Sequence, residues 1–184
     1  MSSSLRLAVD DYERMIANGA FVGLERRLEF IHGEIREMNP AGPYYFDYIE
    51  FLTYWSHSSV SRDEARIQIQ SAILLGDSLP EPDVMWLRAK RYGGQRPRGS
   101  DAHLIIEVAD TSLRYDLGEK AMLYAQAGIT DYWVVGIESQ VVHQHRNPTT
   151  DGYQEVQVFQ RNETLSPLFK PSISLPLDKL FSEE

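Results

Sequence analysis

The stretches Ala-His-Leu-Ile-Ile-Glu-Val at residues 102–108 and Asp-Tyr-Trp-Val-Val at residues 131–135 flank a segment with helical character, Tyr115 to Ala127. The first stretch is an almost continuous apolar run, which is typical of a strand buried on both faces. Gly128 supplies a stop signal for the helix. A strand, a helix and a second strand in this order predict a mixed α/β sheet.

Further elements are predicted on both sides of this unit. Upstream, a helix is expected over residues 7–18 and a second one over residues 44–58. Between them, two short runs around His32-Gly33 predict a tight β-hairpin. The remaining expected strands cover residues 66–75, 83–87, 141–145 and 153–159. The predicted fold class is therefore α/β (α+β), with a mixed central β-sheet flanked by helices and an N-terminal helix and β-hairpin.

Size and composition limit the classes of protein that the chain can represent. Its 184 residues, 42% hydrophobic and 24% charged, fit a single globular domain spanning residues 1–184. The absence of cysteine excludes a disulfide scaffold and thiolate chemistry, and it fits the reducing cytoplasm. No apolar run has the length of a membrane span, and the N-terminus has no apolar stretch typical of a signal peptide. We therefore expect a cytoplasmic protein that does not enter a membrane.

The charge balance is acidic, with 18 Lys and Arg against 27 Asp and Glu and a net charge of −9. This balance disfavours broad, non-specific binding of nucleic acid, which depends on neutralising phosphates. It is compatible with a domain that gathers carboxylates around a metal ion.

Asp83 and Glu107 are candidate metal ligands because of their spacing. If residues 83–87 and 102–108 form an antiparallel hairpin, pairing Asp83 with Glu107 centres the hairpin inside the polar turn, next to Gly93-Gly94. Two carboxylates facing each other about 5 Å apart repel unless a proton or a cation lies between them. A hard divalent ion is a natural occupant. The alternative is that both acids are ordinary surface residues at strand ends.

Lys120 lies on the apolar face of the helix predicted after Glu107. A lysine that faces the core needs an anionic partner, because burial of an unpaired ammonium group is costly. Asp116, one turn earlier, could supply that partner as a plain i,i+4 pair. The other interpretation directs Lys120 to the Asp83 and Glu107 carboxylates. Glu29 is a further candidate carboxylate, unless it is a solvated charge on a strand face.

Taken in order, these features resemble the PD-(D/E)XK nuclease superfamily and, within it, the Uma-type (Uma-two) family of restriction endonucleases. The resemblance extends from about residue 8 to residue 180. The stretches that carry it are Leu28–Ile35, Glu81–Val84, Leu104–Val108 and Asp116–Val135.

The resemblance implies a restriction-endonuclease-like core and hydrolysis of DNA phosphodiester bonds with Mg²⁺ or Mn²⁺. Asp83 and Glu107 would hold the ion, helped by the Val108 carbonyl and by Glu29. Lys120 would orient the attacking water or stabilise developing charge. The superfamily usually places this lysine two residues after the glutamate, where this chain has Ala109.

Four positions depart from the family's pattern: His32, Tyr45, Asp110 and Gly136. None removes the proposed triad. The changes at Tyr45 and Asp110 favour a second interpretation, a non-catalytic binding or regulatory module with the nuclease fold. A third is an unrelated α/β domain in which Asp116 and Lys120 simply pair.

A basic strip lies in the polar turn between the two strands that carry the acids. It contains Arg88, Lys90, Arg91, Arg96 and Arg98 and no acidic residue. The strip could follow a DNA backbone, or it could be an ordinary solvated loop. The hairpin geometry puts it at the far end from the carboxylates, so contact with substrate would need wrapped DNA or a second subunit. A homodimer or higher homo-oligomer would also supply the two sites that double-strand cutting usually needs.

Overall fold

A six-stranded sheet forms the centre of the molecule in the computed structural model, which describes residues 5–39 and 42–182. Its spatial order is β3-β4-β5-β6-β7-β8, and β5 and β6 are its parallel pair. The neighbouring pairs on either side of them are antiparallel. The strands are β3 (Ala65–Ile69), β4 (Val84–Arg88), β5 (Ala102–Ala109), β6 (Asp131–Gly136), β7 (Val141–Thr149) and β8 (Gly152–Gln160). The predicted mixed sheet is confirmed.

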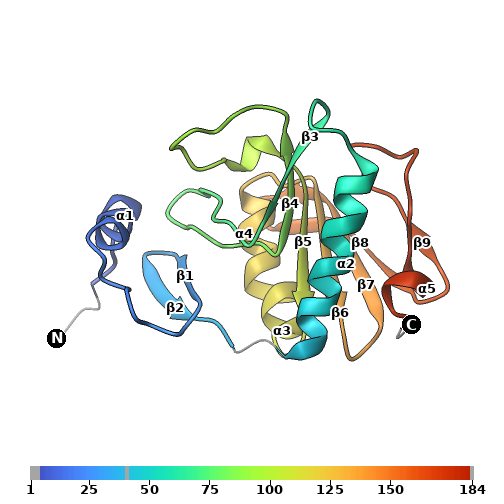
Figure 1. The fold of residues 1–184 in the computed structure, drawn as a ribbon, viewed down its shortest axis with the longest axis horizontal. Coiled ribbons are helices and arrows are strands. Elements are labelled where there is room, and N and C mark those ends of the chain that lie inside the picture. Colours follow the sequence, from blue (N-terminus) through green and yellow to red (C-terminus); the bar gives the residue numbers. More distant parts are fainter. Residues whose placement is uncertain (1–4, 40–41, 183–184) are drawn as a thin grey trace.

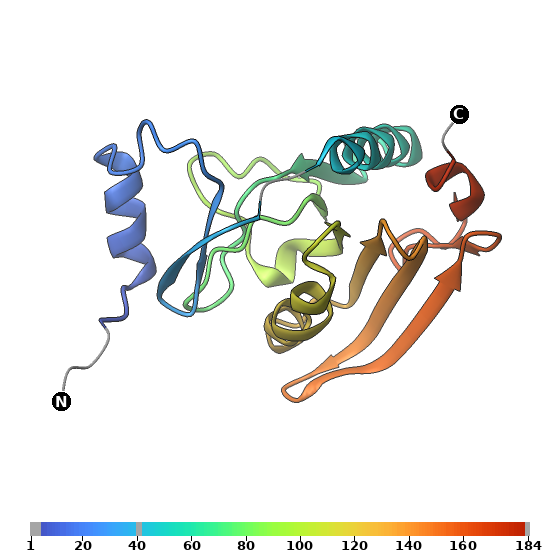
Figure 2. The ribbon, with the colours of Figure 1, turned by 90° about the horizontal axis from the view of Figure 1, so that it is seen from below.

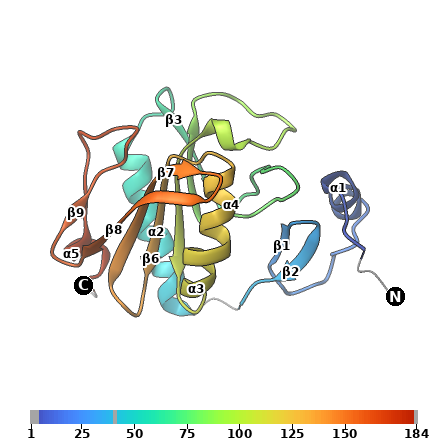
Figure 3. The same cartoon turned by 180° about the vertical axis from the view of Figure 1, so that it is seen from behind.

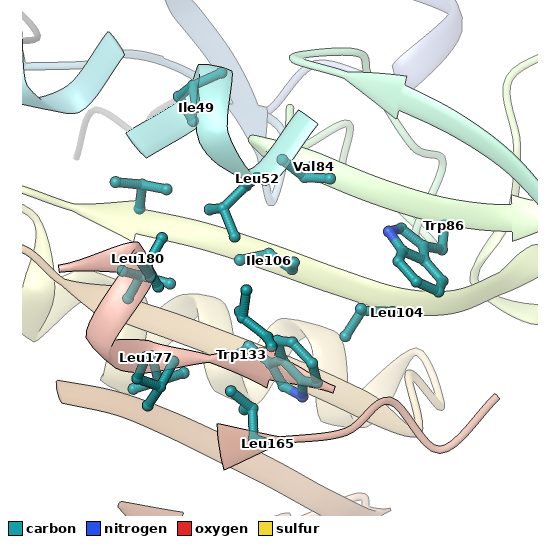
Figure 4. Packing of buried hydrophobic residues seen from close by; sticks show 14 of the residues in the cluster. Ile49, Leu52, Val84, Trp86, Leu104, Ile106, Trp133, Leu165, Leu177 and Leu180 are labelled. Carbon is teal, nitrogen blue, oxygen red and sulfur yellow. The ribbon is translucent and has the colours of Figure 1, made fainter. Parts of the chain in front are cut away.

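Helices cover both faces of this sheet. Helix α2 (Pro43–Ser59) lies on one face and α4 (Ala121–Gln126) on the other, as Figures 1 and 3 show from opposite sides. On the α2 face, Trp86, Ile106 and Trp133 pack with Leu52 of the helix (Figure 4). Because successive side chains of a strand point to opposite faces, the odd-numbered residues of β5 point toward α4. This alternation sends Glu107 to the α4 face.

The C-terminal segment completes the core on the α2 side. It contains β9 (Thr164–Leu165), β10 (Leu175–Pro176) and α5 (Leu177–Leu180). Strands β9 and β10 form a small antiparallel pair. Their leucines and those of α5 belong to the same buried cluster as Trp133 (Figure 4). In the described part of the chain, no helix combines the length and apolar character that crossing a bilayer requires.

The predicted N-terminal helix and hairpin are present as α1 (Val9–Ala17), β1 (Leu28–Ile31) and β2 (Glu34–Glu37). They lie beside the central sheet, at the opposite end of the molecule from α5 (Figures 1 and 2). The hairpin turn has a positive φ at His32 (51°) and at Gly33 (77°), as the preferred two-residue turns require. Tyr12 of α1 stacks on Phe30 of β1, with ring centroids 4.7 Å apart. The hairpin carries Glu29 toward the sheet.

The register of β4 against β5 is the one expected from the sequence. Val84 pairs with Ile106 and Trp86 with Leu104, so one further step along both strands sets Asp83 opposite Glu107. The basic segment, which includes η1 (Gly99–Asp101), joins the other ends of these strands. The sheet therefore brings the two acids together at the end away from that loop.

Three elements differ from the prediction. The strand expected over residues 141–145 continues to Thr149 as β7. The strand expected over residues 66–75 ends at Ile69, because Gln70 has a φ of 46° and turns the chain out of the sheet. The helix expected over residues 115–127 is composite. It consists of α3 (Leu113–Tyr115), the π-helical turn η2 (Asp116–Lys120) and α4. This π-helical turn places Lys120.

Candidate functional site

Four carboxyl groups lie buried around one cavity of about 720 Å³. They belong to Glu29 in β1, Asp83 before β4, Glu107 in β5 and Asp116 in η2, and each residue is at most 3% exposed. Val108 and Lys120 also line the cavity. The structure thus brings together every residue of the predicted acid and lysine set, from four separate segments.

Lys120 bridges two of these carboxylates. Its Nζ lies 2.9 Å from Oε1 of Glu29 and 2.9 Å from Oε1 of Glu107. The hydroxyl of Tyr124 donates a second hydrogen bond to the same Glu107 oxygen, at 2.6 Å. Lys120 is 2% exposed, so this is a buried charge with two anionic partners.

The simple i,i+4 pair of Asp116 with Lys120 is not among the ion pairs of the described residues. Asp116 instead accepts a hydrogen bond from Ser112 Oγ at 2.5 Å. The π-helical turn accounts for the difference, because its i→i+5 spacing rotates Lys120 away from the alignment that an α-helix would give. Lys120 therefore faces the strand acids.

Asp83 is held on both of its oxygens. Oδ2 accepts a hydrogen bond from the backbone N–H of Val108 at 2.8 Å, and Oδ1 accepts one from the hydroxyl of Tyr45. Nη2 of Arg27 lies 3.9 Å from the same Oδ1. Arg27 was not singled out in the sequence, although it lies two residues before Glu29 and, by strand alternation, on the same side.

Glu29 is fixed from the segment that leads to Asp83. Its Oε1 accepts a hydrogen bond from the backbone N–H of Glu81 at 3.0 Å, in addition to the Lys120 contact. The hairpin is thereby attached to the strand-entry segment Glu81–Asp83. Glu29 is a buried member of the cluster, not a solvated charge on a strand face.

Negative charge in the cavity is under-compensated. Burial raises the pKa of Asp83 and raises that of Glu107 well above its usual value. Burial likewise raises the pKa of Asp116 to about 6. For Lys120, burial alone would lower the pKa, but the Glu107 and Glu29 carboxylates outweigh it and raise the pKa well above the ordinary value. The lysine stays charged, and the carboxyl groups compete for too little positive charge.

The donor set of this cavity fits a hard, hydrated divalent cation. The described residues contain no group of three or more His, Asp or Glu side chains gathered as a complete metal site. Asp83, just before β4, and Glu107, in β5, carry carboxylate oxygens of the kind that such an ion prefers. Mg²⁺ is commonly bound by one or two carboxylates and keeps several waters, so a complete protein cage is not required.

The five basic residues of the polar turn lie elsewhere: none of them lines the cavity. The side chains of three of them make polar contacts within the described chain. Lys90 pairs with Asp101 at 2.7 Å, Arg96 with Glu13 at 2.9 Å, and Arg88 donates to the Ser100 carbonyl at 3.0 Å. The arginines that line the cavity are Arg27, Arg36 and Arg114.

Two of the four departures from the family's pattern lie at the cavity. Tyr45 and Asp110 line it, while His32 is in the hairpin turn and Gly136 ends β6. Tyr124 was not singled out in the sequence as a site residue, yet its hydroxyl reaches Glu107. Tyr124 lies four residues after Lys120, and this spacing is the feature of the sequence that could have indicated the contact.

Comparisons with known proteins agree with this architecture. The Uma2 family model, described as "Putative restriction endonuclease", matches residues 9–178. Among solved structures, a putative nuclease belonging to DUF820 from Anabaena variabilis superposes with a TM-score of 0.78 at 17% identity. That alignment covers 95% of this chain and 97% of the other, and at this identity it shows the shared fold. No curated protein matches the chain significantly.

Proposed function

Because the chain belongs to the Uma2 family, described as "Putative restriction endonuclease", we propose that its buried acidic cavity is the active site of a metal-dependent endonuclease. The proposed reaction is hydrolysis of phosphodiester bonds in DNA. The observation that carries the proposal is the pairing of Lys120 with Glu29 and Glu107 beside Asp83, at one end of the sheet.

In this proposal, Asp83, Glu107 and the Val108 carbonyl hold Mg²⁺ or Mn²⁺, with Glu29 close by. Such an ion, when bound, lowers the pKa of a coordinated water and offsets charge at the phosphoryl group. The protein's own part is to hold two carboxylates at fixed positions on adjacent strands. The raised carboxyl pKa values support this assignment, because a divalent cation would replace the protons that the metal-free cluster favours.

Lys120 is the proposed water-orienting or charge-stabilising group. Its ammonium stays protonated beside Glu29 and Glu107, so it acts as a hydrogen-bond donor and a positive charge, not as a base. Arg114, an exposed residue that lines the cavity, would contact the DNA backbone. A homodimer would provide a second site for cutting the other strand.

One observation favours a second candidate, a non-catalytic module that keeps the nuclease fold. Asp83 already accepts hydrogen bonds from Tyr45 and Val108 and lies near the Arg27 guanidinium. If these contacts fully satisfy Asp83, the cavity binds a polar ligand without cleaving it.

A plasmid-nicking assay with Mg²⁺ or Mn²⁺ separates the two candidates. Wild type is expected to nick supercoiled DNA with either ion and to stop in EDTA. Asp83→Asn should lose this activity while keeping the side-chain shape. Asp47→Asn, which changes an exposed residue of α2, is the matched control and should cut like wild type. Metal-independent nicking, or equal activity in Asp83→Asn, would reject the nuclease proposal.

A further inference from the structure

The hydroxyl of Tyr45 is the meeting point of three polar side chains. It contacts Oδ1 of Asp83, and it accepts hydrogen bonds from Nη1 of Arg27 at 2.8 Å and from Nε2 of Gln70 at 2.9 Å. We propose that Tyr45 is a positioning residue, whose hydroxyl, oriented by Arg27 and Gln70, fixes the Asp83 carboxylate for metal binding. The inference rests on the proposed function in taking Asp83 as a metal ligand.

The direction of the Tyr45–Asp83 hydrogen bond follows from counting donors and acceptors. A phenolic oxygen has one proton to donate and two lone pairs to accept with, whereas the guanidinium and amide N–H groups of Arg27 and Gln70 can only donate. These two groups occupy both lone pairs of the Tyr45 oxygen. The phenolic proton is therefore left for Asp83, which accepts it most strongly as a carboxylate.

The same arrangement fixes the plane of the Asp83 carboxylate. Val108 N–H holds Oδ2 from β5, and Tyr45 holds Oδ1 from the first turn of α2. Each carboxylate oxygen keeps further lone-pair capacity for a cation. Tyr45 and Asp83 both line the cavity, so a bound ion would meet a carboxylate that is already oriented.

Backbone geometry supports a dedicated arrangement around Tyr45. Gln70 takes a φ of 46° where β3 ends, and its N–H donates to the Asp83 carbonyl at 3.1 Å. This turn directs the side-chain amide of Gln70 to the Tyr45 hydroxyl and ends the strand. Arg27 is held from the other side, where its carbonyl accepts a hydrogen bond from Met38 N–H at the base of the β1–β2 hairpin. Tyr45 itself is only 5% exposed.

Calorimetric titration with Mn²⁺ tests the inference with a readout other than activity. Hydrogen-bond partners of metal-ligating side chains typically contribute about 10- to 100-fold to metal affinity. Tyr45→Phe is therefore expected to weaken Mn²⁺ binding by about that factor. Tyr44→Phe removes the same hydroxyl from the neighbouring tyrosine, which is 65% exposed, and should bind Mn²⁺ like wild type. Equal Mn²⁺ affinity in Tyr45→Phe and wild type would overturn the proposal.

A second variant tests the proposal independently, in case Tyr45→Phe does not fold. Gln70→Asn tolerates the positive φ but shortens the side chain, so one lone pair of the phenol is released and its proton is no longer confined to Asp83. Weaker Mn²⁺ binding in Gln70→Asn would support the proposal, and unchanged binding would overturn it.

The outcomes also separate this inference from the proposed activity. If wild type binds Mn²⁺ and Tyr45→Phe weakens it, but no DNA is nicked, the positioning role stands and the nuclease proposal fails. If wild type binds no Mn²⁺, metal-dependent activity and the metal-binding part of this inference both fail, and crystal structures of the metal-free proteins test only whether Tyr45 orients Asp83. An Asp83 side chain that leaves Val108 N–H in Tyr45→Phe would support positioning, and an unchanged one would overturn it.

Discussion

At Lys120, one ammonium group with 2% exposure is stabilised by two carboxylates, each 2.9 Å away. Such a buried ion cluster adds little stability compared with well-packed apolar residues, but removing one member leaves uncompensated charge in the interior. The side chain is thus costly to remove whether or not the protein is an enzyme. Stability and activity must be measured separately at this residue.

Lys120→Ala is expected to lower the free energy of unfolding by about 3–5 kcal/mol, because Glu29 and Glu107 lose their common partner. Urea unfolding measures the change. Arg26→Ala is the control, since the Arg26 and Glu37 side chains of that pair are 62% and 53% exposed and surface pairs contribute about 0.2–1 kcal/mol. Similar losses in the two variants would contradict the buried ion cluster.

Asp116 provides a pH test. Burial raises its pKa from 3.8 to about 6, so the folded protein binds the proton more tightly than the unfolded chain. The stability that this tighter proton binding contributes is fully present below about pH 4 and is lost as the pH rises through 6. A shift of this size corresponds to about 3 kcal/mol.

In metal-free buffer, Asp116→Asn should therefore gain stability relative to wild type as the pH rises from 4 to 7. Urea unfolding at a series of pH values measures this difference. A difference that does not change with pH would show that Asp116 has no raised pKa.

Among the elements, the β1–β2 hairpin positions Glu29, and its turn depends on Gly33. This glycine has a φ of 77°, and an added Cβ would lie 2.9 Å from the Leu7 carbonyl oxygen. Both features oppose any side chain at this position.

Gly33→Ala is expected to destabilise the protein by more than about 1 kcal/mol, through the positive φ and the contact with Leu7. Gly94→Ala is the control, because a Cβ there meets no atom within 4 Å. Thermal unfolding compares the two variants. If Gly33→Ala is as stable as Gly94→Ala, the turn does not have the conformation described.

How far the sequence predicted these elements depends on which interactions are local. The register that sets Asp83 opposite Glu107 followed from the hairpin geometry, and the His32-Gly33 turn followed from its residue types. The end of β3 at Gln70 could not be predicted in this way, because the positive φ of Gln70 depends on contacts with Asp83 and Tyr45. The π-helical turn also escaped prediction, since the residues of η2 are compatible with an ordinary α-helix.

For the site, the sequence indicated Glu29, Asp83, Glu107 and Lys120, and the structure brings them together. Their chemical roles stay a prediction. The contacts of Arg27 with the Tyr45 hydroxyl and Asp83 were not foreseen, because they join segments far apart in the chain. They form only where the segment before β1 meets the first turn of α2 and the residue before β4.

Across the whole molecule, the distribution of basic residues bears on where DNA would bind to the proposed nuclease. The basic strip of residues 88–98 and the cavity lie at opposite ends of β4 and β5. For a duplex at the cavity, this arrangement argues against contact with the strip unless DNA wraps or a second subunit takes part.

Two exposed arginines distinguish these arrangements: Arg114 lines the cavity, and Arg91 belongs to the strip. On a short duplex, Arg114→Gln should weaken binding and reduce the salt slope by about 0.9, the value for one lost phosphate contact. Arg91→Gln should leave the slope unchanged. Fluorescence anisotropy over a range of salt concentrations measures both, and the reverse result would place DNA on the basic strip.

The most direct test of the central claim is calorimetric titration of Mn²⁺ into wild type, Asp83→Asn and the control Asp47→Asn. We predict that wild type and Asp47→Asn bind the ion with equal affinity and that Asp83→Asn does not bind it. Binding by Asp83→Asn that matches wild type would contradict the assignment of the cavity as a metal site.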